Sequence, residues 1–183
     1  MLVKHSVPLE QETTLHSVTL VPRLGYSLNL LTDIVDILEK KYHEIKESNK
    51  SMVLDFDESD KAHISAIKLE QTVIHSLDIL LHIKLRTGYI SGIDSILEVL
   101  PASIPMLRTV SAQLFDVLPL CSQKLSEMSV HLGSIVLDSA VLTKARFDFS
   151  QSNKESCIIL DEVKLMADSK LSKQYPNLDF SKL

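Results

Sequence analysis

Apolar side chains recur at helical spacing in three stretches of the chain. In the first stretch they alternate by intervals of four and three, which predicts a helix from about residue 21 to 47 with one apolar side. The positions are Leu24, Leu28, Leu31, Val35, Leu38, Tyr42 and Ile45. Residues 1–14 mix Pro, Glu, Gln and Thr without such a period, so we expect a flexible leader there.

A second helix is predicted from about residue 60 to 90. Ser59 or Asp60 can cap its N-terminus through a side-chain oxygen. Its apolar residues occupy more than one side, which indicates contacts with two neighbours. Because the connection between the first two helices is short and polar, we expect them to form an antiparallel hairpin.

The longest apolar repeat, here called the long repeat, occupies residues 93–142. Its positions are Ile93, Leu97, Leu100, Ile104, Leu107, Ser111, Leu114, Leu118, Cys121, Leu125, Met128, Leu132, Ile135, Ser139 and Leu142. As one straight helix this tract would span roughly 75 Å, too long for a compact chain of this size. Either the tract folds back on itself, or the protein extends and buries the repeat against another copy.

Prolines and glycines divide the long repeat and the residues before it. Pro101, Pro105 and Pro119 would each remove an interior hydrogen bond and bend or break a helix. Gly88 and Gly92 raise the entropic cost of helix formation just before the repeat. We therefore predict that these five residues are hinges between a closed and an extended conformation.

A polar linker and a last amphipathic helix are predicted after the long repeat. The apolar period is lost over residues 143–157 and returns as a narrow stripe from about residue 158 to 173. A short helix on a tether either folds back onto the body or is offered to a partner. The expected organisation is a flexible leader (1–14), a helical core (15–142), a linker (143–157) and a C-terminal helix with its tail (158–183).

Composition narrows the class of protein. Four Gly, six Pro and 5% aromatic residues supply too few turns for a sandwich or barrel, so an all-α fold is expected. The formal charge of -5 argues against nucleic acid as a partner. The two cysteines do not make a disulfide framework, and no secretory signal is recognised, so we expect a cytoplasmic protein. Since charged or polar residues interrupt every apolar cluster, membrane contact is expected to be peripheral.

Motifs for nucleotide binding, hydrolysis and zinc coordination are missing from the sequence, so we expect no catalytic residue, cofactor or metal. His75, Asp78 and His82 could share one helix face, but they have no obvious fourth ligand. A polar helix edge is the favoured interpretation. The heptads by themselves equally favour a purely structural coiled coil.

A joint pattern over some 110 residues carries a resemblance to a known family. It comprises the stretch from Leu69 to Asp78, the stretch from Leu100 to Pro105, the Leu125-Ser126-Glu127-Met128 segment, and the last helix from Leu160 through Pro176. In these segments the chain resembles the ESCRT-III family, and most closely its archaeal cell-division branch, the CdvB-like proteins.

The resemblance implies a long helical hairpin, an extended or folded-back third and fourth helix, and a tethered C-terminal helix. It implies a non-enzymatic, polymer-forming subunit that remodels membranes at the division site. Such a subunit assembles with itself and with paralogous subunits, and a CdvC-like AAA ATPase disassembles the polymer. A soluble coiled-coil adaptor or scaffold without membrane activity remains the alternative.

Two sets of site residues follow from the resemblance combined with the long repeat. The expected polymer interface is Ile93, Leu97, Leu100, Ile104, Leu107, Leu114, Leu118, Leu125, Met128 and Leu132. The expected ATPase-docking residues are Leu160, Glu162, Val163, Leu165 and Leu171.

Overall fold

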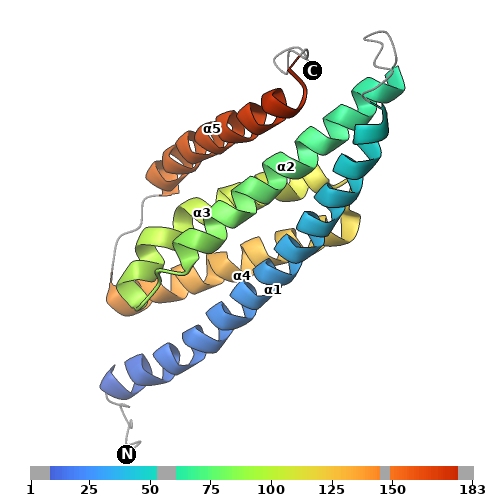
Figure 1. Cartoon of the computed structure of the whole chain (residues 1–183). Coiled ribbons are helices and arrows are strands. Elements are labelled where there is room, and N and C mark those ends of the chain that lie inside the picture. Colours follow the sequence, from blue (N-terminus) through green and yellow to red (C-terminus); the bar gives the residue numbers. More distant parts are fainter. Residues whose placement is uncertain (1–8, 53–60, 145–148, 177–183) are drawn as a thin grey trace, which may run out of the picture.

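The computed structural model describes residues 9–52, 61–144 and 149–176, and these residues are helical almost throughout (Figure 1). The helices are α1 (Leu9–Met52), α2 (Lys61–Thr87), α3 (Ile93–Leu114), α4 (Pro119–Thr143) and α5 (Phe149–Gln174). No strand occurs in the described ranges. The predicted all-α class is therefore confirmed.

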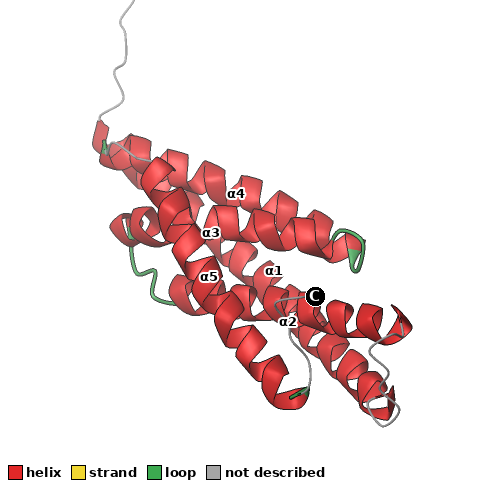
Figure 2. Cartoon of the chain, turned by 90° about the horizontal axis from the view of Figure 1, so that it is seen from above, coloured by secondary structure: helices red, strands yellow, loops and turns green. Residues whose placement is uncertain are grey.

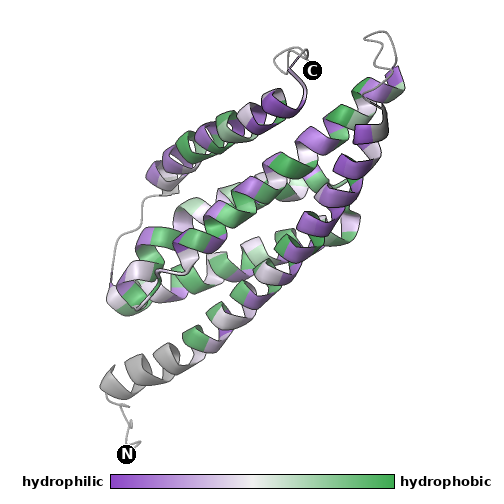
Figure 3. Ribbon diagram, in the orientation of Figure 1, coloured by the Kyte–Doolittle hydropathy of each residue, from purple (hydrophilic) through white to green (hydrophobic). Residues whose placement is uncertain are grey.

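Helices α1 to α4 form a closed ring in which each packs against the next. The contacts join α1 to α2, α2 to α3, α3 to α4 and α4 back to α1. α5 lies across α2 and α3, on the side of the ring opposite to α1 and α4 (Figures 1 and 2). α5 therefore leaves the α1–α4 side of the ring uncovered. Hydrophobic residues recur along α2, α3 and α4, whereas the C-terminal turns of α1 are largely hydrophilic (Figure 3).

The long repeat folds back on itself to form the antiparallel pair α3 and α4. The chain turns over residues 115–118, and Pro119 occupies the first turn of α4, where its missing N–H would have had no helical partner. The side chains of Leu107, Leu114 and Leu125 are fully buried between the two helices and their neighbours. Of the two arrangements open from the sequence, this conformation adopts the folded-back one.

A serine of the long repeat meets a serine of α4 near this turn. Ser111 Oγ donates to the carbonyl oxygen of Ser122 at 2.8 Å, and Ser122 Oγ donates to the carbonyl oxygen of Ser111 at 2.7 Å. Both side chains are buried, so the reciprocal bonds satisfy hydroxyls that would otherwise lack partners. The serine that interrupts the repeat at position 111 therefore ties α3 to α4.

α1 is longer than the sequence indicates. The predicted helix of residues 21–47 is wrong at both ends, because α1 extends from Leu9 to Met52. The expected leader is likewise helical over residues 9–14, while residues 1–8 lie outside the described ranges. Pro22, which would be a first-turn residue of a helix starting at residue 21, lies inside α1. The predicted cap at Ser59 or Asp60 also lies outside the described residues, and α2 is described from Lys61.

Two of the predicted hinges do not interrupt a helix in this conformation. α3 continues through Pro101 and Pro105. Pro101 and the neighbouring Ala102 are buried, and α3 packs against α2, α4 and α5. Burial against three neighbours outweighs the two hydrogen bonds that the prolines remove. By contrast, Gly88 and Gly92 lie at the α2–α3 turn and Pro119 lies at the start of α4.

The predicted linker is largely helical. α4 extends to Thr143 and α5 begins at Phe149, so of residues 143–157 only 145–148 lie outside the described ranges. Ser152 and Ser156 are buried and lie two turns and one turn, respectively, before the buried Ile159. They continue the buried stripe of α5 with small residues that a hydrophobic pattern does not register. The C-terminal helix is correspondingly longer than the predicted 158–173.

We expect Leu125→Ala to lower the free energy of unfolding by about 2–5 kcal/mol, because it leaves a cavity at a fully buried position between α3 and α4. Leu120→Ala is the matched control, because Leu120 lies on the same helix and is 75% exposed, and its effect should stay within about 0.5 kcal/mol. Urea unfolding followed by circular dichroism measures both. Equal effects of the two substitutions would contradict the described packing.

Candidate functional site

The predicted polymer interface forms part of the bundle's own core. Seven of its ten residues are buried and the other three are half-buried. The buried ones are Leu100, Ile104, Leu107, Leu114, Leu125, Met128 and Leu132, and the half-buried ones are Ile93, Leu97 and Leu118. In this conformation these side chains can face another copy only after α3 and α4 separate.

The predicted ATPase-docking residues do not form one surface. Val163 and Leu171 are buried against the body, and Leu160 is half-buried. Glu162 and Leu165 are exposed on the opposite side of α5. Of the two arrangements proposed for the last helix, this conformation shows the one folded back onto the body.

Polar side chains of α2 and α5 pair along the length of their contact. Asp168 Oδ1 accepts a hydrogen bond from Gln71 Nε2 at 3.0 Å and lies 2.7 Å from His75 Nε2. Lys170 Nζ lies 2.7 Å from both carboxylate oxygens of Asp78. Near the other end of α5, Arg86 Nη2 donates to Glu155 Oε1 at 2.6 Å. These pairs fix the register of α5 on α2.

A fully buried carboxylate joins three helices at one end of this interface. Glu70 accepts hydrogen bonds from Asn49 Nδ2 at 2.7 Å, from Gln174 Nε2 at 2.9 Å and from Tyr175 Oη at 2.6 Å. All three donors are neutral groups, so within the described residues the carboxylate is held by hydrogen bonds and not by an ion pair. Burial and the bond to Glu70 raise the pKa of Tyr175 far above its usual range, which keeps its hydroxyl a donor.

An apolar cluster lies beside the buried carboxylate. Ile74 of α2 packs with Ala167 and Leu171 of α5 and with Tyr175, and Tyr42 of α1 lies against them. Ala167 is fully buried, and its small side chain lets the two helices approach closely. The site therefore combines directional polar contacts with a small dry core.

His75, Asp78 and His82 all belong to the side of α2 that α5 covers. Within the described ranges no three His, Cys, Asp or Glu side chains are placed to hold a metal ion. His75 and Asp78 are paired to α5 as above, while His82 Nε2 is buried and has no hydrogen-bond partner among the described residues. Burial, with Arg86 nearby, lowers the pKa of His82, and Glu162 partly offsets this. The polar edge predicted from the sequence is an interface between helices.

Sequence reasoning placed three polar residues of α2 on one face but missed their partners. The pairs join residues about ninety positions apart, such as His75 with Asp168. Asp168 and Lys170 lie in the predicted C-terminal helix but outside its apolar stripe, which is the periodic signal of that helix. A polar face on each of two helices is the signal that could have suggested the pairing.

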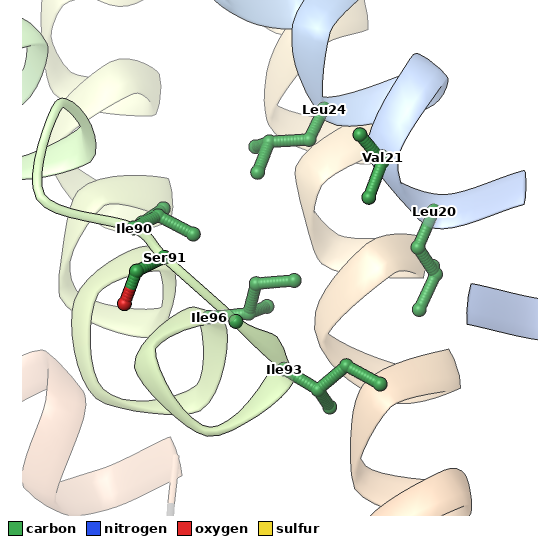
Figure 4. A pocket seen from close by; sticks show the side chains of 8 residues that line it. Leu20, Val21, Leu24, Ile90, Ser91, Ile93 and Ile96 are labelled. Carbon is green, nitrogen blue, oxygen red and sulfur yellow. The ribbon is translucent and has the colours of Figure 1, made fainter. Parts of the chain in front are cut away.

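A small apolar cavity of about 220 Å³ lies between α1 and the α2–α3 turn (Figure 4). Leu20, Val21 and Leu24 line it from α1, and Ile90, Ile93 and Ile96 line it from the other side. Its other lining residues in the described part of the chain are Ser91 and Gly92, and none of these described lining residues has a titratable side chain. The described lining thus offers apolar surface and no groups for acid, base or metal chemistry.

One helix in the described ranges, α4, is long and apolar enough to cross a membrane by length and composition alone. This corrects the sequence-based expectation that every apolar cluster is too strongly interrupted. The helix packs against α3 and α1, and 39% of its apolar 18-residue stretch is buried in the bundle. Core helices of soluble proteins meet the same criterion, so it is weak evidence for a span.

No model of a known protein family matches the chain, and no solved structure matches it. The contacts described above and the resemblance in sequence are therefore the basis on which a function is proposed.

We expect Tyr175→Phe to lower the free energy of unfolding by about 1–3 kcal/mol, because buried Glu70 would lose one of its donors. Amide hydrogen exchange in the last turns of α5 should also become faster. Ser172→Ala is the control, since Ser172 is exposed and its hydroxyl donates only to the carbonyl of Asp168 within its own helix. A Tyr175→Phe protein as stable as the control would show that the hydroxyl does not anchor α5.

The folded chain should become less stable as the pH falls below about 6.5. The pKa of His82 is lowered in the fold, so below its ordinary value of 6.5 the unfolded chain binds a proton more readily than the folded chain. This contribution favours unfolding as the pH falls and vanishes above that value.

Urea unfolding at pH 7.5 and 5.5 checks this dependence. His82→Gln should show a smaller loss of stability between the two pH values than the wild type, because glutamine does not titrate. Identical losses in both proteins would rule out His82 as a contributor.

Proposed function

We propose that the chain is a polymer-forming subunit that remodels membranes in archaeal cell division, and that the described bundle is its closed form. The resemblance to CdvB-like ESCRT-III proteins implies this activity. The helical hairpin of α1 and α2, the folded-back α3 and α4, and the docked α5 are compatible with it.

The phase of the long repeat across the α3–α4 turn carries the proposal. Leu114, Leu118 and Cys121 keep the spacing of four and three although the chain reverses between them. If residues 115–118 became helical, α3 and α4 would join into one helix with the whole repeat on one side. A permanently folded pair has no need of this continuity, whereas a subunit that opens does.

Opening would expose the expected polymer interface. Leu107, Leu125 and the other apolar residues of the long repeat would leave the bundle core and would be buried again against a neighbouring subunit, itself or a paralogue. The work of the protein is then mechanical, with polymerisation driven by burial. Contact with the membrane is peripheral, and a CdvC-like AAA ATPase supplies the energy for disassembly.

The role proposed for α5 depends on its release. Glu162 and Leu165 are accessible on the docked helix, but Val163 and Leu171 are not. An ATPase that contacts all of these side chains therefore requires α5 to leave α2 and α3. Release of α5 and opening of α3 and α4 belong to one transition in this proposal.

A soluble coiled-coil adaptor is the second candidate. The closed bundle already buries the long repeat internally, as an adaptor would, and the formal charge of -5 provides little attraction to anionic lipid.

A disulfide across the α3–α4 turn tests whether opening is required. Ser111 Oγ and Ser122 Oγ lie 3.2 Å apart, so cysteines at both positions should form a bond that locks the pair closed. The native thiols are removed by Cys121→Ala and Cys157→Ser. We expect the oxidised Ser111→Cys/Ser122→Cys protein to form no filaments or tubulated vesicles, and reduction to restore assembly.

Negative-stain electron microscopy with and without anionic liposomes provides the measurement. The matched controls are the chain lacking native thiols and the same chain with Ser111→Cys alone. Equal assembly of the oxidised and reduced proteins would contradict an opening transition. Small monodisperse particles of the controls under both conditions would favour the adaptor.

A further inference from the structure

α4 has a second apolar side that faces away from the bundle. Val130, Leu137 and Val141 are 66%, 53% and 77% exposed, respectively. The helix already buries Leu125, Leu132 and other residues on its opposite side. α1 and α3 flank the exposed side but do not cover it, and α5 lies across the ring.

The exposed side has the spacing of a coiled-coil seam. Positions 126, 130, 133, 137 and 140 alternate by four and three, and we call them the outer seam. Its residues are Ser126, Val130, Gly133, Leu137 and Ala140. Large residues occupy one heptad position and small residues occupy the other, and none of the five is charged. This is a pattern for packing against another helix.

The packing of the bundle does not require a glycine at position 133. A Cβ atom added there would meet nothing within 4 Å, and no glycine of the described ranges has a positive φ. Glycine in a helix interior is unfavourable relative to alanine, so the bundle alone would favour a larger residue. Close approach of a partner helix to the outer seam would explain why this position has no side chain.

We propose that the outer seam binds the outer seam of a second copy, with the two α4 helices antiparallel and Gly133 of each opposite Leu137 of the other. In an antiparallel pair the two heptad positions face each other, so every large residue meets a small one. In a parallel pair large residues would meet large ones, and a void would remain between two glycines. The outer seam is thus self-complementary under a two-fold axis.

Charge complementarity supports the same register. When Gly133 faces Leu137, the exposed Lys144 at the end of one α4 lies opposite Ser126 and Glu127 of the other. Two-fold symmetry produces this attraction twice. Glu127 is also exposed, and among the described residues it accepts a side-chain hydrogen bond only from Gln123, at 2.9 Å. A pair of opposite charges, Lys144 of one copy and Glu127 of the other, therefore lies at each end of the contact.

The contact is too small for a permanent dimer. The area of the three large side chains exposed on this side of α4, Val130, Leu137 and Val141, is well below the roughly 800 Å² per partner of a standard stable interface. We therefore expect association that depends on concentration. The contact does not require α3 and α4 to separate, so it is independent of the proposed polymerisation.

Gly133→Leu tests the close approach. Open space surrounds the position, so the bundle should fold with an unchanged or higher thermal midpoint, while self-association measured by sedimentation equilibrium should weaken roughly tenfold or more. Gly25→Leu is the matched control, because Gly25 lies within α1 and its added Cβ would also meet nothing within 4 Å. A wild-type chain that stays monomeric at all concentrations, or a Gly133→Leu chain that associates like the wild type, would overturn the proposal.

Two further variants test the register. Glu127→Lys should weaken association several-fold, and Glu127→Lys combined with Lys144→Glu should restore it. In a chain carrying Cys157→Ser, mixed Gly133→Cys and Leu137→Cys proteins should form a disulfide with each other faster than either forms with itself. Faster self-linking of Leu137→Cys would overturn the antiparallel arrangement. The proposed partner would be wrong if lipid vesicles, but not a second copy of the chain, protected these cysteines from reaction with a thiol reagent.

Discussion

The apolar repeat of residues 93–142 is the constraint on which the rest of the bundle depends. Its side chains are too numerous to remain in water, and the tract is too long to be covered in one piece by a chain of this size. Reversal at residues 115–118 lets each half of the repeat cover the other. The hairpin of α1 and α2 then closes the ring around the side chains that α3 and α4 cannot cover alone.

α5 is attached to this ring by a different kind of interaction. Its contact with α2 depends on side-chain pairs such as His75 with Asp168 and Asp78 with Lys170, and on the buried carboxylate of Glu70. Polar pairs contribute little net free energy when both partners can return to water together, although removing one partner alone is costly. The interface therefore fixes the register of α5 on α2. It also makes the release of α5 less costly in free energy than the separation of α3 from α4.

The sequence predicted the helices and the two possible arrangements of the long repeat, but it did not decide between them. Local rules failed where burial outweighed them. Pro101 lies within α3 because packing on three sides offsets its lost hydrogen bond, and Ser152 and Ser156 are buried in α5 although they read as a linker. The partners of His75 and Asp78 could not be predicted, because periodicity within one helix says nothing about which distant helix will cover it.

α4 is apolar on two sides, and this arrangement separates two kinds of contact. The side that faces α3 is satisfied within the closed chain and becomes available only when the pair opens. The outer seam with Val130 and Leu137 is available in the closed chain and is not altered by opening. Under the two proposals, closed copies can meet through the outer seam before either one opens. A weak contact of this kind would raise the local concentration of subunits without committing them to the proposed polymer, because the core residues proposed as its interface are still buried in each chain.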